Sequence, residues 1–212
     1  MASSMNNRVF KGSGYIFCRK HTASVTYPAV ADMASMTDEE ATAIDTFVRA
    51  LATAENELGY LKNGITFNEN ITALQDQDDM GRLKVNDLQS EDANAAFSLF
   101  NANAATIAKV NPLSKTAANT TKKIALTNMG GIANKDDSEY DILFVHPDTE
   151  FGDICVYSLA KNITGLTIGF QPSAVTPLAC NFAAQAIDTT GVLYKISEHE
   201  PGNAVYTPGS ET

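Results

Sequence analysis

ELGYLKNGITFNENITALQDQDDMGRLKVNDLQSEDANAAFSLFN, residues 57–101, passes through several local patterns. Asn63 and Gly64 form the dipeptide that best supplies positive φ to a tight hairpin turn, and strand-like runs flank them. Beyond this turn, apolar residues at alternate positions predict a strand with one buried face. These residues are Ile65, Phe67, Ile71 and Ala73. A polar loop, QDQDDMG, and a further strand segment, RLKVNDL, follow.

The end of this stretch predicts a helix over about residues 90–110. Ser90 is a good N-cap, and Glu91 and Asp92 suit the positive end of a helix dipole. Asn111 followed by Pro112 would stop the helix. Apolar residues recur between these ends at helical spacing. They are Ala93, Ala96, Phe97, Phe100, Ala104 and Ile107. We therefore expect this helix to pack on a sheet as part of the core.

Upstream, a second helix is predicted over about residues 37–57. Thr37 and Glu40 have capping-box spacing, and acidic residues occupy the first turn. Ile44, Phe47, Val48 and Leu51 then form one apolar stripe. Residues 1–36 are expected to hold an N-terminal arm and a first strand, which lies within SGYIFCRKHTASVTY (13–27).

Downstream, residues 113–122 are polar and small and are expected to form a linker or loop. Six β-rich runs follow, separated by turn material: KIALTN, YDILFVH, ICVYSLA, ITGLTIGF, PLACNFAAQAI and VLYKIS. Short strands at this spacing predict a mainly β protein with helices (α+β), built as a β-sandwich or barrel of two sheets. Residues 37–212 would form a single domain, flanked by a core helix and with an extra N-terminal helix.

Charge is distributed unevenly along this acidic chain, whose net charge is −10. Residues 1–36 carry four basic and one acidic residue (+3), residues 37–92 four basic and thirteen acidic (−9), and residues 93–212 seven basic and eleven acidic (−4). Such a balance argues against a protein that grips phosphate backbones for affinity. It is typical either of a solvated acidic surface or of a polar subunit whose basic end meets an acidic neighbour.

Motifs for catalysis or metal binding are sparse. Cys18, Cys155 and Cys180 are far apart, so we interpret them as small apolar strand residues. HPDTEFGD (146–153) gathers ligand-type side chains, but its proline and glycine favour a solvated turn. The acidic tip at Asp76–Asp79 lacks EF-hand spacing. We predict no enzyme activity, no cofactor and no metal. No apolar run of membrane-spanning length is found, and the first residues lack a signal-peptide core, which predicts a cytosol-like compartment.

The order of elements in residues 57–198 resembles the tail tube family of long-tailed bacteriophages. In that family a strand ends in a glycine-containing turn, an apolar-x-apolar strand follows, and then an acidic loop, another strand and a helix. The matching positions are Gly59, Gly64, Ile65, Phe67, Leu83, Val85, Phe97, Leu99 and Phe100. The ending VLYKISE is similar to the closing strands of the family, and the helix at 37–57 is extra.

The resemblance implies a β-sandwich subunit that assembles into hexameric rings, and these rings stack as the hollow tail tube of a virion. Its partners would be other copies of itself, the tape-measure protein in the lumen, and the tail terminator and distal tail proteins at the ends. DNA would pass through without sequence-specific binding, and no membrane would be involved. Assembly would take place in the cytoplasm of the host bacterium.

Two sets of charged residues are candidates for roles in such a tube. Acidic residues that could face the lumen or a ring edge, where they would repel the phosphate backbone, are Asp76, Asp78, Asp79 and Asp87. Basic residues that could meet the next ring are Arg8, Lys11, Arg19 and Lys20. The alternatives are another virion component on the same fold (a distal tail, tail terminator or contractile-tail inner tube protein), a ligand-binding β-sandwich, or an enzyme around His146.

Overall fold

The computed structural model describes residues 14–77, 84–100, 103–163, 165, 167 and 177–208. It confirms a mainly β protein with helices, and the strands pair in antiparallel sheets. In chain order the elements are β1 (Tyr15–Lys20), α1 (Asp38–Leu51), β2 (Glu57–Gly59), β3 (Leu61–Gln77), β4 (Lys84–Leu99), α2 (Ala104–Val110), β5 (Ser114–Asn119), β6 (Ile124–Met129), the short 3-10 helix η1 (Ile132–Asn134), β7 (Tyr140–His146), β8 (Ile154–Asn162), β9 (Leu178–Gln185) and β10 (Lys195–Glu198).

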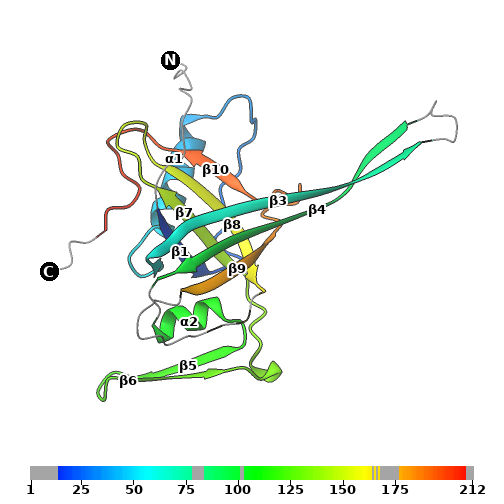
Figure 1. Ribbon diagram of the computed structural model, residues 1–212. Helices are drawn as coiled ribbons and strands as arrows, with labels where there is room; N and C mark the ends of the chain where they lie inside the picture. Colours follow the sequence, from blue (N-terminus) through cyan, green and yellow to red (C-terminus); the bar gives the residue numbers. More distant parts are fainter. Residues whose placement is uncertain are drawn as a thin grey trace.

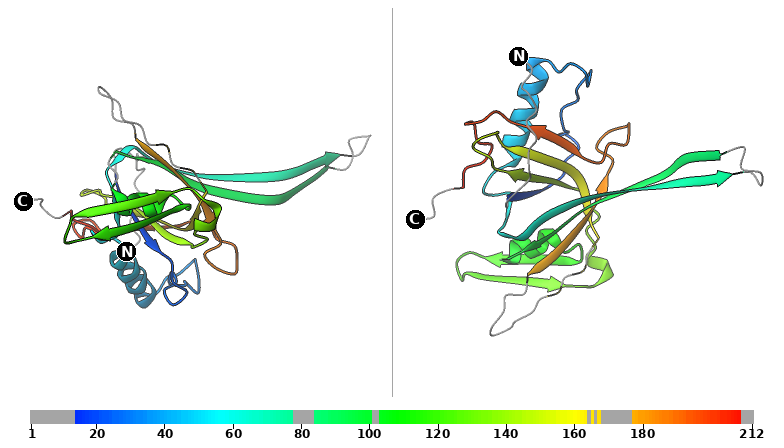
Figure 2. Two further views of the ribbon diagram at one scale, coloured as in Figure 1. Left: turned by 90° about the horizontal axis from the view of Figure 1, so that it is seen from below. Right: turned by 45° about the horizontal axis from the view of Figure 1, so that its top comes forward.

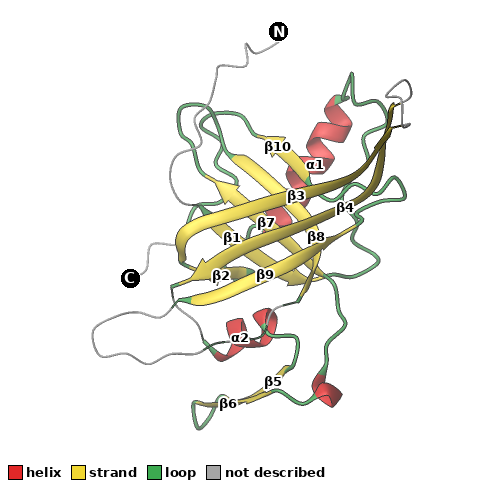
Figure 3. Cartoon of the chain, turned by 45° about the vertical axis from the view of Figure 1, so that its right-hand side comes forward, coloured by secondary structure: helices red, strands yellow, loops and turns green. Residues whose placement is uncertain are grey.

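The main sheet has eight strands in the order β2-β1-β7-β8-β9-β4-β3, with β10 paired to β8. One edge of β8 pairs with β7, and the other is shared by β10 and β9, which pair with its first and second halves. The sheet curls, so that β3, β4 and β9 lie across β1, β7 and β8 (Figure 3). Strands β5 and β6 form a separate two-stranded sheet.

Two hydrophobic clusters lie on opposite faces of β1, β7 and β8. The first fills the curl of the sheet and includes Ile16, Cys18, Phe97, Leu99, Ile142, Cys180 and Phe182. The second lies under α1 and includes Phe17, Phe47, Val48, Leu51, Leu143, Val145, Cys155 and Tyr157. Successive residues of β1 and β7 enter alternate clusters, which explains why the central strands are apolar on both faces.

The three cysteines are free and buried in strands, as the sequence indicates. Burial raises the pKa of each thiol, Cys18, Cys155 and Cys180, to about 12. They therefore act as small core residues.

Helix α1 confirms the N-terminal helix prediction. Thr37 and Glu40 form both hydrogen bonds of the capping box, and the predicted apolar stripe is buried. The helix ends at Leu51, however, and does not continue to residue 57. Asn56 caps the last turn by donating from its side chain to the Leu51 carbonyl, and its own carbonyl accepts from the Cys18 amide. Residues 57–59 can then pair with β1 as β2.

The helix predicted over 90–110 is wrong for most of its length. Residues 84–99 form strand β4, and only residues 104–110 are helical, between Asn103 as N-cap and Asn111 as C-cap. Residues 93–99 also carry apolar side chains at alternate positions, which is a strand pattern. Pairing with β3 on one edge and β9 on the other favours the strand over the helix. The buried residues of that pattern are Ala93, Ala95, Phe97 and Leu99. Helix α1 covers one face of the main sheet, and the short α2 places Val110 and Ile107 against the other hydrophobic cluster.

Asn63 and Gly64 do not form the predicted hairpin turn. Both have positive φ, 67° and 75°, as such a turn requires, but they lie inside the continuous strand β3. Leu61 pairs with Leu99 and Ile65 with Phe97, so three residues of β3 stand opposite one of β4. The dipeptide thus makes a bulge, and the strand pairing continues beyond it.

Residues 113–122, expected as a linker, contain β5. Its six residues pair with β6, the strand predicted within KIALTN. Thr116 donates its hydroxyl to the Ala104 carbonyl of α2, and Ser114 does so to Ile107. This hairpin and α2 form a unit beside the main sheet (Figure 1). Among the described helices, none is long and apolar enough to cross a membrane.

Candidate functional site

The outer parts of β3 and β4, residues 69–77 and 84–92, extend away from the body of the molecule as a two-stranded arm (Figures 1 and 2). We call these residues the arm. Closer to the body, β4 pairs with β9 through residues 94–99, whereas the arm part of β4 is paired only with β3. Within the described chain, the arm therefore has no second layer of structure against it.

Apolar side chains on the arm are exposed to solvent. Ile71 is 55% exposed and Leu88 71%. Leu88 pairs with Ala73, two positions beyond Ile71, so these three residues share one face. That face continues the one which, nearer the body, carries Ile65 and Phe67 against the core. The prediction of one buried face is thus correct only near the body, and farther out the same face is bare.

An arm of this kind has little intrinsic support. Isolated two-stranded hairpins are marginally stable in water because they lack a hydrophobic layer to pack against. The register of the arm shifts between Thr72 and Ala73, where Gln89 is left without an opposite residue, and such a bulge increases strand twist. Exposed apolar residues on a projecting ladder are typical of an interaction surface.

Two of the predicted acidic residues are found on the arm. Asp87 is exposed and pairs with Leu74, and Asp76 pairs with Val85. Asp78 and Asp79 lie outside the described residues. Glu69, Glu91 and Asp92, which were not predicted as site residues, are also exposed on the arm. Ladder positions place all of these on the strands of the arm, whereas the sequence indicated a loop for Asp76.

Of the predicted basic residues, the structure describes Arg19 and Lys20, and these two point in different directions. Arg8 and Lys11 lie outside the described residues. Lys20 is exposed, and its Nζ lies 3.5 Å from Oδ2 of Asp136. Arg19 is directed into the molecule, where its Nη2 lies 2.9 Å from Oδ2 of Asp141. The structure thus assigns Arg19 an internal contact, different from the predicted contact with another ring.

Asp141 is the centre of a buried polar cluster at the end of β1. Its side chain is fully buried and accepts hydrogen bonds from Arg19 and from the Tyr157 hydroxyl, at 2.9 Å each. Its other neighbour is Nδ1 of His21, at 2.8 Å. Burial and the adjacent Asp141 carboxylate raise the pKa of Tyr157, so its hydroxyl stays protonated as a donor. The cluster satisfies a carboxylate that would otherwise be very costly to bury.

Strand β3 is an edge of the main sheet. Its outer edge is contacted near the body by Tyr194, whose hydroxyl donates to the Asn68 carbonyl at 3.1 Å and whose ring lies against Phe67. A long edge strand presents backbone donors and acceptors that can pair with a strand of another chain. The edge of β3 is thus a second candidate surface, continuous with the arm.

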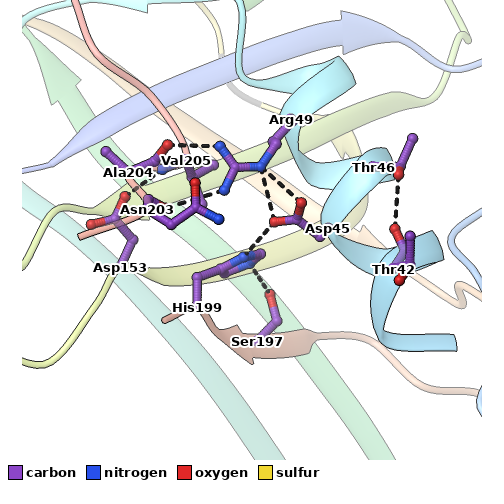
Figure 4. A network of polar contacts seen from close by, with 10 residues as sticks. All are labelled: Thr42, Asp45, Thr46, Arg49, Asp153, Ser197, His199, Asn203, Ala204 and Val205. Atoms are coloured by element: carbon purple, nitrogen blue, oxygen red, sulfur yellow. Dashed lines mark hydrogen bonds and ion pairs between the residues drawn. The ribbon is translucent and has the colours of Figure 1, made fainter. Parts of the chain in front are cut away.

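A polar network joins α1 to the C-terminal segment (Figure 4). Ser197 Oγ is 3.1 Å from Nε2 of His199, and Nδ1 of the same ring is 3.0 Å from Oδ1 of Asp45. This order of contacts is that of a Ser–His–Asp triad, which makes a hydrolase a function to be tested. Sequence reasoning missed it because Asp45 is far from Ser197 in the chain.

The surroundings of this network favour a structural role. Arg49 holds Asp45 through Nε and donates both terminal nitrogens to the carbonyls of Asn203 and Ala204. Burial opposes ionisation of Asp45, but hydrogen bonds from Arg49 and His199 outweigh it and lower the pKa of this carboxyl. We call Asp45, Arg49, Ser197 and His199 the clamp, since together they fasten residues 197–204 to α1.

The turn around HPDTEFGD uses its carboxylates to hold the backbone. Asp148 accepts from the amides of Glu150 and Phe151, and Asp153 accepts from those of Asp148 and Val205. In the part of the chain that the structure describes, no group of three or more His, Cys, Asp or Glu residues could hold a metal ion. These contacts fit the turn interpretation of the segment.

Two open grooves complete the candidate surfaces. One, of about 380 Å³, lies at the Asn63–Gly64 bulge and is lined by residues of β3, β4 and β9, including Lys62, Thr66, Ser98 and Asn181. The other, of about 410 Å³, lies between the segments after α2 and β8. The clamp residues line neither of them.

Comparison of the chain with protein-family models and with curated proteins gives no match.

Proposed function

We propose that this chain is a structural subunit that self-assembles into stacked hexameric rings, forming the tail tube of a long-tailed bacteriophage. The observation that carries the proposal is the arm. It projects beyond the sheet and exposes Ile71 and Leu88, and no segment among the described residues covers them. A subunit that works by polymerising needs such a surface, because each copy must give its neighbour something to bind.

The curled sheet supports the same proposal. We propose that β1–β7–β8 and β3–β4–β9 act as the two layers of the sandwich that the resemblance implies, with the cluster around Phe97 and Phe182 between them. The edge of β3 would pair with a neighbouring copy, so that sheets join around the ring. A ring closes such head-to-tail contacts without leaving an open edge.

Charge suits a conduit for DNA. The chain carries a net charge of −10, and Asp87 and its acidic neighbours on the arm are exposed. An acidic lumen would repel the phosphate backbone and let the genome slide past without adhering. The tape-measure protein would occupy that lumen before ejection, and the terminator and distal tail proteins would close the ends.

Substitution on the arm tests whether it carries assembly. Leu88→Glu should reduce assembly strongly, because a charge replaces an apolar contact, while the fold persists since the side chain is solvent-exposed. Ile196→Glu on β10 is the matched control, because Ile196 is 69% exposed and Leu88 71%. Sedimentation velocity measures the fraction of each variant that is assembled. Equal assembly of Leu88→Glu and wild type would remove the arm from the proposal.

Other virion components on this fold remain alternatives, and copy number separates them. A tube subunit is present in many copies per particle, whereas a terminator or distal tail protein is not. Quantitative mass spectrometry of purified virions therefore discriminates these roles.

A further inference from the structure

The hairpin β5–β6 has one face that nothing in the described chain covers. Thr116 and Ser114 point toward α2, as their hydrogen bonds show. Residues of the opposite face alternate with them along the strands. In the ladder, Ala117 pairs with Leu126, with Asn119–Ile124 and Lys115–Asn128 on either side. We call this face the platform.

The platform is apolar at its centre. Ile124 and Leu126 are each 62% exposed, and Ala117 is exposed between the strands. These two large aliphatic side chains and an alanine correspond in size and polarity to the three exposed residues on one face of the arm, Ile71, Ala73 and Leu88. Two-stranded ladders with apolar faces can pack face to face, as sheets do in sandwiches.

The charges of the two surfaces are opposite. From residue 103 to residue 129 the sequence contains four lysines and no acidic residue: Lys109, Lys115, Lys122 and Lys123. The described arm carries exposed acidic side chains at Glu69, Asp87, Glu91 and Asp92. Glu69 and Glu91 lie on the face of Ile71 and Ala73, because Glu91 pairs with Ile71 and Glu69 precedes it by two residues, whereas Asp87 and Asp92 lie on the opposite face. Among the described residues, neither the three exposed lysines of the hairpin nor these carboxylates form an ion pair. Complementary potentials of this kind steer two surfaces together and fix their register.

The two surfaces cannot meet within one chain. The arm extends from one side of the main sheet, and the β5–β6 hairpin lies beside α2, away from the tip of the arm in every view (Figures 1, 2 and 3). A contact between them must join two copies, and because the surfaces differ, it is head-to-tail and repeats from copy to copy.

We propose that the platform of one copy receives the arm of the next, through Ala117, Ile124 and Leu126 against Ile71, Ala73 and Leu88, with the lysines beside Glu69 and Glu91. This inference rests on the proposed function and names the contact that links its subunits. It also gives the basic hairpin, whose first strand the sequence indicated as a linker, a role in assembly.

Charge reversal and charge swap test the contact. The double variant Lys115→Glu/Lys122→Glu should raise the protein concentration needed for half-assembly about tenfold, since two attractive contacts become repulsive. Adding Glu69→Lys/Glu91→Lys, on the face of the arm that carries Ile71, should restore assembly. The first change takes the net charge from −10 to −14 and the second returns it to −10, so the swapped chain matches wild type in net charge.

Cross-linking tests the contact directly. The native thiols are buried, so a short bismaleimide should react with an introduced surface cysteine. Leu88→Cys chains and Leu126→Cys chains of different tag mass are mixed and assembled. A cross-linked heterodimer is expected, whereas Leu88→Cys mixed with Ile196→Cys should give none. An equal yield in both mixtures would overturn the proposed contact.

The outcomes separate this inference from the proposed function. If wild type assembles and the lysine variant assembles equally well, or the swap fails to restore assembly, the platform contact is wrong and the tube proposal stands. If wild type forms no assembly under any condition, the tube proposal itself fails. Circular dichroism spectra of each variant, compared with that of wild type, serve as the control that the fold is intact.

Discussion

At the scale of single residues, the buried carboxylate of Asp141 shows how a charge becomes structural. It lies within 2.8–2.9 Å of Nη2 of Arg19, Nδ1 of His21 and the Tyr157 hydroxyl, although the sequence marks Arg19 only as part of a basic N-terminal stretch. Arg19 and Lys20 are neighbours in sequence and have different roles, because alternate residues of a strand point to opposite faces. Spacing alone could not tell which of the two is internal.

Removing Arg19 should therefore destabilise the fold. Arg19→Ala leaves a buried carboxylate without its guanidinium, so we expect a loss of about 3 kcal/mol in the free energy of unfolding. Lys20→Ala, which removes an exposed pair, should change it by less than about 1 kcal/mol. Urea unfolding measures both. Equal effects would contradict the internal role of Arg19.

The clamp makes a prediction that also tests the hydrolase alternative. The His199 side chain is only 7% exposed and bridges Ser197 and Asp45, so His199→Ala should cost about 2 kcal/mol of stability. Ser197→Ala should cost less than about 1 kcal/mol, since Asp45 still holds the ring. A fluorophosphonate probe should leave Ser197 unlabelled. Stoichiometric labelling that disappears in Ser197→Ala would instead establish an active site.

The lowered pKa of Asp188 makes the stability of the fold depend on pH. Hydrogen bonds from Thr190 and Lys195 lower the pKa of this carboxyl from 3.8 to about 2. A lowered folded-state pKa contributes stability above the unfolded value, and this is lost as the pH falls through about 2. Asp188→Asn should thus be less stable than wild type at pH 7, and the difference should close between pH 4 and pH 2. Urea unfolding midpoints of both proteins across this pH range measure the difference. A difference in stability that stays constant with pH would contradict the prediction.

At the scale of elements, the sequence could predict those helices and strands whose ends and buried faces are determined by nearby residues. Helix α1 begins at a capping box and carries an unambiguous stripe, so both its start and its buried face are correct. Strand β4 could not be predicted, because Phe97 fits both a helical and an alternating pattern and only pairing with β3 and β9 decides. Strand β5 was missed because its small polar residues resemble a linker, whereas its partner β6 lies in the predicted run KIALTN.

Contact between elements far apart in sequence gives a sharper test at Gly152. It has φ +87°, and a Cβ there would lie 1.8 Å from the His199 carbonyl oxygen. Gly152→Ala should therefore cost about 3 kcal/mol or more, from strain and overlap together. Gly191 is the matched control, because its φ is +86° and nothing lies within 4 Å of the added carbon. Gly191→Ala should cost only about 1–2 kcal/mol. Thermal unfolding compares them, and equal costs would mean that the turn does not pack on His199.

At the scale of the whole molecule, the candidate site was predicted only in part. The acidic stretch around Asp76 and Asp87 was indicated by sequence, and the structure places both on the arm. The projection of the arm could not be predicted. A strand that extends beyond the core still alternates apolar and polar residues, although its apolar side chains, such as Ile71, are exposed there. Burial is set by what lies opposite a residue, and for the arm we propose that this is another copy.

The state of assembly of the full chain tests the central claim most directly. We expect negative-stain electron microscopy of the purified protein, over rising concentration and several buffers, to show hollow tubes or rings with six-fold symmetry. Rings should dissociate toward monomers in Leu88→Glu. A monodisperse monomer at high concentration in all conditions would contradict the account.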